Sequence, residues 1–227
     1  MKPVAYITGA SRGLGRCVAE RLAGRYALGL GCFHADPPHL PDSVILRGDV
    51  SRSDTSRMAA EELMRRFGRI DLFIANAAIS VDRPFLRMKD EEWDDVIRTN
   101  LSAVFFGLRE TAGPLRQAGG SAILVSSILG RRGESGSANY CAAKAGVIAL
   151  ARSAAREWAP QARVNVFIPG YMPTDMGMQN PDVLRNAVAD HLGGTMTPVE
   201  EAADLMIALA ETKTVTGQII TADGRIS

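Results

Sequence analysis

The sequence predicts an α/β protein: one doubly wound parallel sheet of about seven strands, with helices on both faces. Short apolar runs of strand length alternate along the chain with longer segments in which apolar residues have helical spacing. The first run passes through a glycine-rich turn into a helical segment, and a second run follows, as in a parallel β-α-β unit. With 227 residues, 46% of them hydrophobic, the chain fits a single domain, 1–227.

Each element is predicted from its local pattern. The strands are predicted at Pro3–Thr8, Tyr26–Phe33, Ser43–Arg47, Asp71–Ala75, Ser121–Val125, Arg163–Ile168 and Gly217–Ala222. Helices are predicted over Arg16–Ala23, Ser53–Phe67, Asn139–Trp158 and Pro198–Ala210, with another that begins at Asp90. We expect Ser51 or Ser53 to cap one of these helices, and Ser137 or Asn139 to cap another.

The glycine-rich turn between the first strand and the first helix predicts a dinucleotide site. Gly9, Gly13 and Gly15 fall within the segment GASRGLG. Glycines let the backbone approach a pyrophosphate, and the free N–H groups at a helix start attract its negative charge. Glycine in a turn can also serve the backbone conformation alone, but the strand-turn-helix context favours the dinucleotide interpretation.

Three polar side chains within residues 126–144 have the spacing of a proton-transfer site. Tyr140 and Lys144 lie one turn apart on a predicted helix, and Ser127 directly follows a predicted strand. We expect the lysine to lower the tyrosine pKa from its usual ~10, which would make Tyr140 a general acid. A second hydrogen bond from Ser127 to the developing oxyanion would suit reduction of a C=O group, or its reverse. The alternative is an ordinary surface pair that arose by chance.

Two further polar residues and one segment are candidates. Asp49 follows a strand at its carboxyl end, where it either contacts an adenine or caps the next turn. Asn100, which lies among apolar residues, is either a satisfied core amide or a group that holds a water. The segment Gly177–Thr195 is rich in Gly and Asn, which favours a mobile substrate lid; a surface excursion is the alternative.

Composition argues against several other classes. Lys+Arg 26 against Asp+Glu 25, without a recognition motif, argues against a nucleic-acid partner. No apolar run approaches the ~18 residues of a membrane span, and the N-terminus lacks a signal pattern. Three cysteines without CxxC spacing and three scattered histidines argue against a disulfide framework and a metal site. We therefore expect a cytoplasmic protein that holds no metal.

Together, these motifs resemble the short-chain dehydrogenase/reductase family over essentially the whole chain. The matching residues are, in chain order, Thr8-Gly9-x-x-x-Gly13-x-Gly15, Asp49-Val50, Asn100, Ser127, Tyr140-x-x-x-Lys144 and Pro169-Gly170. The segments LRMKDEEWDDVIRTNLSAVF, SANYCAAKAG and NVFIPGYMPTDM are most similar to the bacterial 3-oxoacyl-[acyl-carrier-protein] reductases. The resemblance implies a Rossmann-type fold and an NADP(H) cofactor.

The resemblance also implies a role for each matched position. Tyr140 would donate the proton and Ser127 would bind the carbonyl. Lys144 would lower the tyrosine pKa and hold the nicotinamide ribose, and Asn100 would keep a water in a proton relay. The implied cofactor-binding residues are Gly9, Ser11, Arg12, Gly13, Leu14, Gly15, His34, Asp49 (adenine), Val50, Asn76 (adenosine side), Ala77, Tyr140, Lys144, Pro169, Gly170 and Thr174 (nicotinamide carboxamide).

Three departures from the family pattern stand out. Ala75-Asn76-Ala77-Ala78 replaces Asn-Asn-Ala-Gly, which predicts the loss of an amide that ties the sheet and weaker cofactor binding. The segment after the second strand is short and contains three prolines, which exclude a regular helix. The terminal Asp-Gly-Gly becomes Asp223-Gly224-Arg225, in a region that such reductases use for subunit contact.

The end of the second strand predicts the cofactor. An NAD-selective protein places an acidic residue there to accept both ribose hydroxyls. Here Phe33 and then His34 follow, and Arg12 in the glycine turn is able to hold a 2′-phosphate. We therefore expect NADPH to be preferred to NADH.

The expected function is NADPH-dependent reduction of a ketone. The first substrate class is a 3-oxoacyl thioester, on acyl carrier protein or coenzyme A, in fatty-acid or polyketide biosynthesis. The alternatives are another carbonyl or alcohol (sugar, polyol, steroid or quinone) and a catalytically silent NADP-binding scaffold. Arg131 and Arg132 form either a contact for an acidic carrier protein or a solvated basic turn. Excess apolar residues in Asn100–Leu115 and Asn139–Trp158, helices that the family pairs between subunits, predict a homotetramer.

Overall fold

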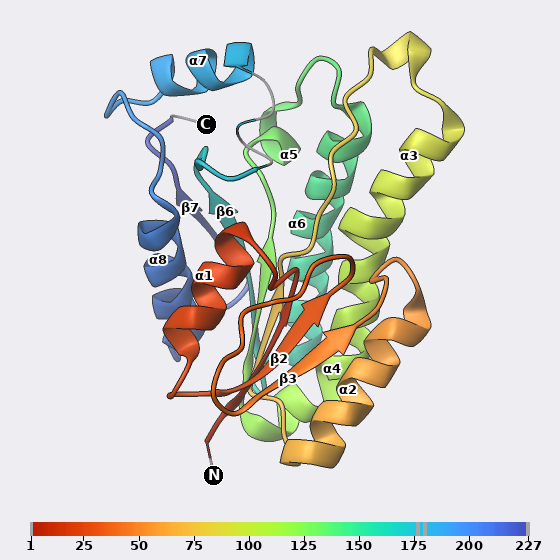
Figure 1. The fold of residues 1–227 in the computed structure, drawn as a ribbon, viewed down its shortest axis with the longest axis vertical. Coiled ribbons are helices and arrows are strands. Elements are labelled where there is room, and N and C mark those ends of the chain that lie inside the picture. Colours follow the sequence, from red (N-terminus) through yellow and green to blue (C-terminus); the bar gives the residue numbers. More distant parts are fainter. Residues whose placement is uncertain (1, 176–177, 179–180, 226–227) are drawn as a thin grey trace.

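The computed structural model describes residues 2–175, 178 and 181–225, and its sheet confirms the predicted fold class (Figure 1). Seven strands lie in the order β3-β2-β1-β4-β5-β6-β7, and every neighbouring pair is parallel. The strands are β1 (Val4–Thr8), β2 (Ala27–Cys32), β3 (Ser43–Arg47), β4 (Leu72–Ala75), β5 (Ser121–Val125), β6 (Arg163–Pro169) and β7 (Ile219–Ala222). The strand order reverses between β1 and β4, which is the point where such sheets bind nucleotides.

Helices cover both faces of this sheet. They are α1 (Gly13–Leu22), α2 (Ser53–Phe67), η1 (Phe85–Arg87), α3 (Asp90–Ile97), η2 (Arg98–Ser102), α4 (Ala103–Ala118), α5 (Leu129–Arg132), α6 (Ala138–Trp158), α7 (Pro181–Ala189) and α8 (Val199–Glu211). One core cluster joins the sheet to α2, α4 and α6. The other joins it to α1 and α8. None of the helices in the described ranges is long and apolar enough to cross a membrane.

The central strands are buried on both faces, which explains their unbroken apolar sequences. All five residues of β1 are buried, as are all four of β4. In the parallel pairing, Tyr6 lies opposite Phe73 and Ile7 opposite Ile74. The two aromatic rings meet in one core cluster, 5.3 Å apart, and the two isoleucines enter the other.

Several helix boundaries differ from those predicted. The first helix begins at Gly13 instead of Arg16, so the last part of the glycine turn is already helical. Arg52 precedes α2, and no side chain caps that helix, so the predicted serine cap is wrong. Ser137 does precede α6, but its hydroxyl donates to Asp82 Oδ1 at 2.9 Å instead of capping the helix.

The segment around Asn100 is a π-helical turn. It connects α3 to α4. The predicted lid, Gly177–Thr195, contains α7, and its residues 177, 179 and 180 lie outside the described residues.

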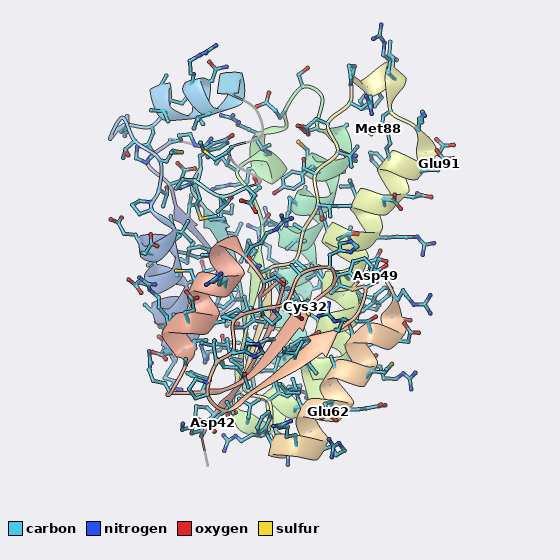
Figure 2. The ribbon with its side chains drawn as sticks, in the orientation of Figure 1. Cys32, Asp42, Asp49, Glu62, Met88 and Glu91 are labelled. Carbon is cyan, nitrogen blue, oxygen red and sulfur yellow. The ribbon has the colours of Figure 1, made fainter. Side chains whose placement is uncertain are left out.

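The carboxyl ends of the strands lie at one side of the sheet. Figure 2 shows this for two neighbouring strands: Cys32, which ends β2, and Asp49, which follows β3, lie at one end, and Asp42, which precedes β3, lies at the other. The loops after the strands therefore meet in one region, and this region contains the candidate site.

Candidate active site

A cavity of about 1000 Å³ at the carboxyl ends of the strands brings most of the predicted site residues together. Two of them do not reach its wall, Gly15 and Asn100. The predicted residues that line it are Gly9, Ser11, Arg12, Gly13, Leu14, His34, Asp49, Val50, Asn76, Ala77, Ser127, Tyr140, Lys144, Pro169, Gly170 and Thr174.

The glycine turn needs its glycines for close packing. Gly9 has a φ of 69° and Gly13 a φ of 53°, values that other residues rarely adopt. A Cβ at Gly9 would lie 2.9 Å from the Ala77 Cα, and one at Gly15 would lie 2.3 Å from the Gly9 carbonyl oxygen. Gly15 therefore packs helix against turn and makes no part of the cavity wall.

The start of α1 fits an anion. Arg12 precedes the helix in extended conformation, and no side chain caps its first N–H groups. Uncapped N–H groups at a helix start, beside a cavity wall formed by Gly9 and Gly13, suit the pyrophosphate of a dinucleotide. The donors present therefore fit the cofactor that the sequence predicts.

An amide still ties the sheet at the end of β4. The Asn76 side-chain amide donates to the Thr8 and Gly9 carbonyl oxygens, each at 3.1 Å. The Thr8 hydroxyl accepts from the backbone N–H groups of Asn76 and Ala77, at 3.0 and 3.1 Å. The amide that departs from the family pattern is missing at Ala75, but Asn76 and Thr8 still connect β1 to β4.

The end of the cavity next to β2 and β3 carries the residues predicted to select the cofactor. Asp49 Oδ1 accepts from the Ser51 N–H at 2.9 Å, so its carboxylate caps a turn and also lines the cavity. Arg12 pairs with Asp175 at 3.2 Å, and both side chains are largely exposed. The His34 imidazole packs against the Phe33 ring in a tilted arrangement, with ring centroids 4.1 Å apart.

An acidic residue, Asp36, does follow β2, but it forms an ion pair with an arginine. The Asp36 carboxylate pairs with the Arg47 guanidinium, which also donates to the Phe33 carbonyl oxygen at 2.9 Å. Sequence reasoning missed this pair because its two members come from different strand ends. Neither residue lines the cavity.

Ser127 and Tyr140 lie together in the partly buried wall of the cavity. Ser127 follows β5, and its hydroxyl accepts from the Leu129 N–H at 3.2 Å. Burial raises the pKa of Tyr140 to about 12, and a hydrogen bond with Ser127 lowers it in part. The tyrosine is therefore a neutral phenol at pH 7.

Lys144 lies buried beneath this tyrosine. Its ammonium is 5.6 Å from the centre of the Tyr140 ring and donates to the Val125 carbonyl oxygen at 2.9 Å. Burial lowers the pKa of Lys144 to about 8. Its helix is held close to β5 because the Ser126 hydroxyl donates to the Lys144 carbonyl oxygen at 2.7 Å.

The expectation that Lys144 lowers the pKa of Tyr140 is wrong for this arrangement. Desolvation raises the pKa of the phenol and disfavours the ammonium, so burial dominates at both groups. The lysine also lies against the ring face and donates a hydrogen bond to the Val125 carbonyl oxygen instead of the phenol.

Asn100 is a satisfied core amide, the first of its two interpretations. Its side chain is fully buried, donates to the Ile79 carbonyl oxygen at 2.8 Å and accepts from the Ile79 N–H at 2.9 Å. These two bonds hold the loop after β4, and Ile79 itself lines the cavity. Through its side chain, Asn100 acts as a positioning residue.

Sequence reasoning treated Asn139 only as a helix cap, but its side chain anchors the start of α6. The fully buried amide donates to the carbonyl oxygens of Val81 and Glu92, at 3.2 and 3.0 Å. Its oxygen accepts from the Tyr140 N–H at 2.7 Å. The only sequence signal for these contacts is an amide residue directly before the tyrosine. The contacts position Tyr140.

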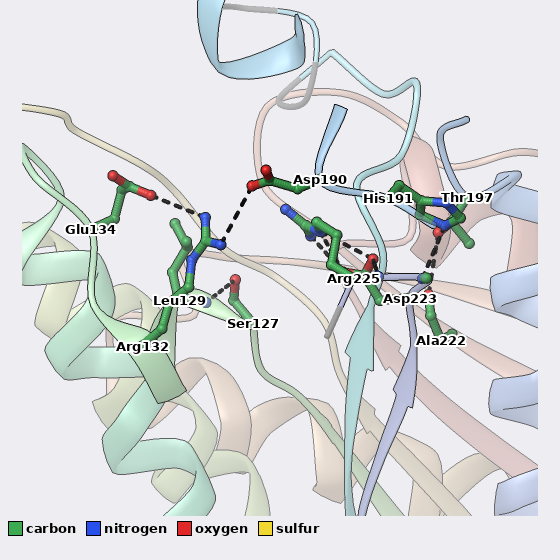
Figure 3. A network of polar contacts seen from close by, with 11 residues as sticks. Ser127, Leu129, Arg132, Glu134, Asp190, His191, Thr197, Ala222, Asp223 and Arg225 are labelled. Carbon is green, nitrogen blue, oxygen red and sulfur yellow. Dashed lines mark hydrogen bonds and ion pairs between the residues drawn. The ribbon is translucent and has the colours of Figure 1, made fainter. Parts of the chain in front are cut away.

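The end of the cavity next to α5 and β7 carries polar side chains, several of which Figure 3 shows. Arg225 lines it and pairs with Asp223, with side-chain exposures of 7% and 0%. Arg132 pairs with Glu134 at 3.2 Å and approaches Asp190 to 4.0 Å. His191 packs on Gly224, whose N–H donates to His191 Nε2 at 2.9 Å.

Within the described ranges, no group of three or more His, Cys, Asp or Glu side chains could hold a metal ion. The cysteines Cys17, Cys32 and Cys141 are free thiols.

The whole constellation matches a family model. The model described as enoyl-(acyl carrier protein) reductase matches residues 9–225, from the glycine turn to Arg225. The chain belongs to the short-chain dehydrogenase/reductase family. It is an oxidoreductase of this family, and the predicted resemblance is confirmed.

Two curated relatives in this family cover nearly the whole chain. The 3-oxoacyl-[acyl-carrier-protein] reductase of Escherichia coli is 35% identical over an alignment of 237 positions that covers 97% of this chain and 96% of that protein. The reductase of the same name from Staphylococcus aureus is 36% identical over an alignment of 241 positions that covers 99% of this chain and 98% of that protein.

Solved structures agree. A putative gluconate dehydrogenase from Agrobacterium tumefaciens has a TM-score of 0.89 and 29% identity, over 98% of this chain and 94% of that chain. A dehydrogenase/reductase from Sinorhizobium meliloti has a TM-score of 0.90 and 27% identity, over the same shares.

Proposed function

We propose that the protein reduces a ketone to a secondary alcohol with NADPH, and that the ketone is a 3-oxoacyl thioester. One observation carries the proposal: Ser127 and Tyr140 share a cavity with an uncapped helix start and its glycine turn. The curated relatives named above, which are 3-oxoacyl-[acyl-carrier-protein] reductases, support the substrate class.

In this reaction Tyr140 donates the proton. A phenol with a pKa of about 12 is fully protonated at neutral pH, and an alkoxide is more basic than a phenolate, so the transfer is favourable. The Ser127 hydroxyl donates a hydrogen bond to the carbonyl oxygen as negative charge develops there. Lys144, with a pKa of about 8, is the neighbouring group that exchanges a proton near neutral pH. When bound, the nicotinamide supplies the hydride.

The remaining predicted residues hold the cofactor in this proposal. Gly9, Gly13 and the first N–H groups of α1 take the pyrophosphate, with Ser11 and Leu14 beside them. Asp49 and Val50 border the adenine, and Asn76 and Ala77 the adenosine side. Arg12 and His34 take the 2′-phosphate, which favours NADPH because Arg47 neutralises the acidic Asp36.

The test is the loss of NADPH absorbance. Purified protein is mixed with NADPH and a panel of acetoacetyl thioesters, on N-acetylcysteamine, coenzyme A and acyl carrier protein, alongside a sugar, a polyol-derived ketone, a steroid and a quinone. Turnover of the thioesters above the others supports the proposal. Turnover of another ketone alone moves the substrate to that class, and no turnover with any ketone favours the silent scaffold.

Docking of an acyl carrier protein has weaker support. Arg132 is paired with Glu134 and lies near Asp190, so two carboxylates oppose its attraction for an acidic carrier protein. We propose a cytoplasmic homotetramer, which is consistent with three free thiols and with the apolar faces of α4 and α6.

A further inference from the structure

The end of β7 adds a nearly buried guanidinium to the cavity wall. Arg225 Nε donates to the two carboxylate oxygens of Asp223 at 3.0 and 2.9 Å, and Nη2 donates to Oδ2 at 2.5 Å. Asp223 is fully buried and does not line the cavity. The carboxylate therefore lies behind the guanidinium and fixes its orientation.

One edge of this guanidinium remains available. Asp223 takes Nε and one position of Nη2, and no partner is recorded for Nη1 in the part of the chain that the structure describes. The guanidinium also lies 5.9 Å from the centre of the Tyr171 ring, which lines the same cavity. A planar donor held on two sides is preorganised for an acceptor in the cavity.

Burial of such a pair costs folding energy. Two charges lose their hydration, and an apolar pair of similar size is often as stable. The pair is therefore better explained by a ligand than by folding.

A second charged group lines the same cavity. Asp82 lines the cavity, and its Oδ1 accepts from the hydroxyls of Ser80 and Ser137, at 3.1 and 2.9 Å. A long alkyl chain would displace water from the remaining donor and acceptor positions of both charged groups without replacing those hydrogen bonds, and this cost opposes what the chain gains by leaving water. A short chain that carries oxygen avoids this cost.

We infer that Arg225 determines substrate specificity: the carbon chain beyond the reacting carbonyl is short and carries an oxygen that accepts from the Arg225 guanidinium. This inference rests on the proposed ketone reduction and narrows its substrate to short, oxygenated 3-oxoacyl groups.

Two thioesters of the same size test it. The N-acetylcysteamine thioesters of 4-methoxy-3-oxobutanoate and 3-oxohexanoate differ only in an ether oxygen where the second has a CH₂ group. The ratio of their kcat/KM values with NADPH is divided by the ratio of their borohydride reduction rates, which removes intrinsic reactivity. We expect wild type to favour the methoxy compound about tenfold beyond that reference, and to turn over the 3-oxodecanoyl thioester more slowly than either.

Variants assign the preference to Arg225. Arg225→Met alone would leave the buried Asp223 carboxylate without its ion-pair partner. The main variant is therefore the double variant Asp223→Asn/Arg225→Met. NADPH affinity and circular dichroism show whether it folds. It should bring the corrected ratio to within about twofold of one. If it does not fold, the wild-type ratio still decides.

A corrected ratio near one in wild type, or an unchanged preference in the folded double variant, overturns the inference and leaves ketone reduction standing. Faster turnover of the 3-oxodecanoyl thioester overturns it as well. No NADPH consumption with any of the three removes the proposed function, and the inference with it.

Discussion

At the scale of single residues, the site depends on how burial tunes a phenol and an ammonium one turn apart. Both groups are pushed toward their neutral forms, since the pKa of Tyr140 rises to about 12 and that of Lys144 falls to about 8. A protonated phenol is the form that a reductase needs. The reverse reaction would need the phenolate, so it is expected to become faster as the pH rises.

The first prediction concerns the proton donor. Tyr140→Phe removes the phenolic proton but keeps the ring against Lys144. We expect kcat to fall by ~10²-fold or more, with NADPH affinity near normal. Steady-state rates and a fluorescence titration measure the two quantities. Tyr26→Phe, far from the cavity, is the control, and wild-type turnover by Tyr140→Phe would exclude the tyrosine as donor.

The second prediction concerns Lys144 and stability. Its pKa is about 8 in the folded protein against 10.5 in the unfolded chain, so between these values the unfolded chain binds more protons and stability rises with pH. Lys144→Met removes the cost of the buried charge. We expect its stability relative to wild type to be greatest below pH 8 and to decline as the pH approaches 10.5.

Denaturant unfolding between pH 7 and 10.5 measures this difference. The exposed Lys213 offers a matched control, Lys213→Met, for the loss of a lysine as such. A difference between Lys144→Met and wild type that stays constant with pH would contradict the depressed pKa.

The third prediction concerns cofactor choice. Arg12→Gln and His34→Gln should each weaken NADPH binding and leave NADH binding near wild type, because only NADPH carries the 2′-phosphate. For Arg12 we expect about tenfold or more, the usual value of a charge-assisted bond. Dissociation constants for both cofactors measure it, with Arg16→Gln as control. Equal weakening of NADH would place these side chains away from the phosphate.

At the scale of elements, the sheet fixes how closely helices approach. In α4, a Cβ at Gly107 would lie 2.3 Å from the Phe73 ring, whereas Gly113 in the same helix has open space around its Cβ position. Neither glycine has a positive φ. The two positions therefore separate packing against the sheet from effects within the helix.

The fourth prediction uses this pair. Gly107→Ala should lower the free energy of unfolding by about 1–3 kcal/mol, because the methyl group forces α4 away from the sheet. Gly113→Ala should change it by less than ~1 kcal/mol, because the gain in helix propensity is opposed by crowding of the new Cβ against the ring of the next residue, Pro114. Denaturant midpoints of both variants test this. A Gly107→Ala variant as stable as wild type would mean that α4 is free to shift.

The sequence predicts features that depend on local sequence, and it misses features that depend on contacts between residues far apart in the chain. The strands are predicted almost to the residue, since β3 and β5 are continuous apolar runs bounded by polar segments. The caps fail because Ser137 finds a better acceptor in Asp82, which lies 55 residues away. Tyr140, Lys144 and Ser127 are predictable because their spacing is local.

Long-range contacts account for the rest of the site. The amide of Asn100 bonds to Ile79, and that of Asn139 bonds to Val81. The residues near each asparagine in the sequence do not indicate these partners. The sign of the Tyr140 pKa shift was also beyond the sequence, because it depends on how deeply the phenol is buried.

At the scale of the whole molecule, two helices leave apolar surface uncovered. Phe105 on α4 is 44% exposed. On α6, the exposed residues Ala142, Ala145 and Ala149 follow helical spacing and form a flat face of small side chains. Helices with such faces pack closely against copies of themselves in symmetric assemblies.

The fifth prediction follows from this surface. Wild type should be a tetramer by light scattering, and Phe105→Asp should shift it to smaller species because a charge would be buried at the helix contact. Phe85→Asp, on η1 and outside both helices, is the matched control and should leave the tetramer intact. A wild type that is monomeric and active at working concentrations would contradict the assembly.

The packing of His191 on Gly224 has a consequence for sequence variation. A Cβ at position 224 would lie 2.2 Å from the imidazole, so any other residue there requires the His191 side chain or the chain after α7 to shift. Position 225 is restricted in another way, because the buried Asp223 carboxylate needs a partner. In a library randomised at positions 223, 224 and 225 and selected only for cofactor binding, position 224 should return glycine, whereas positions 223 and 225 should lose their charges together. Selection for turnover should restore a hydrogen-bond donor at 225, because the proposed substrate requires one there.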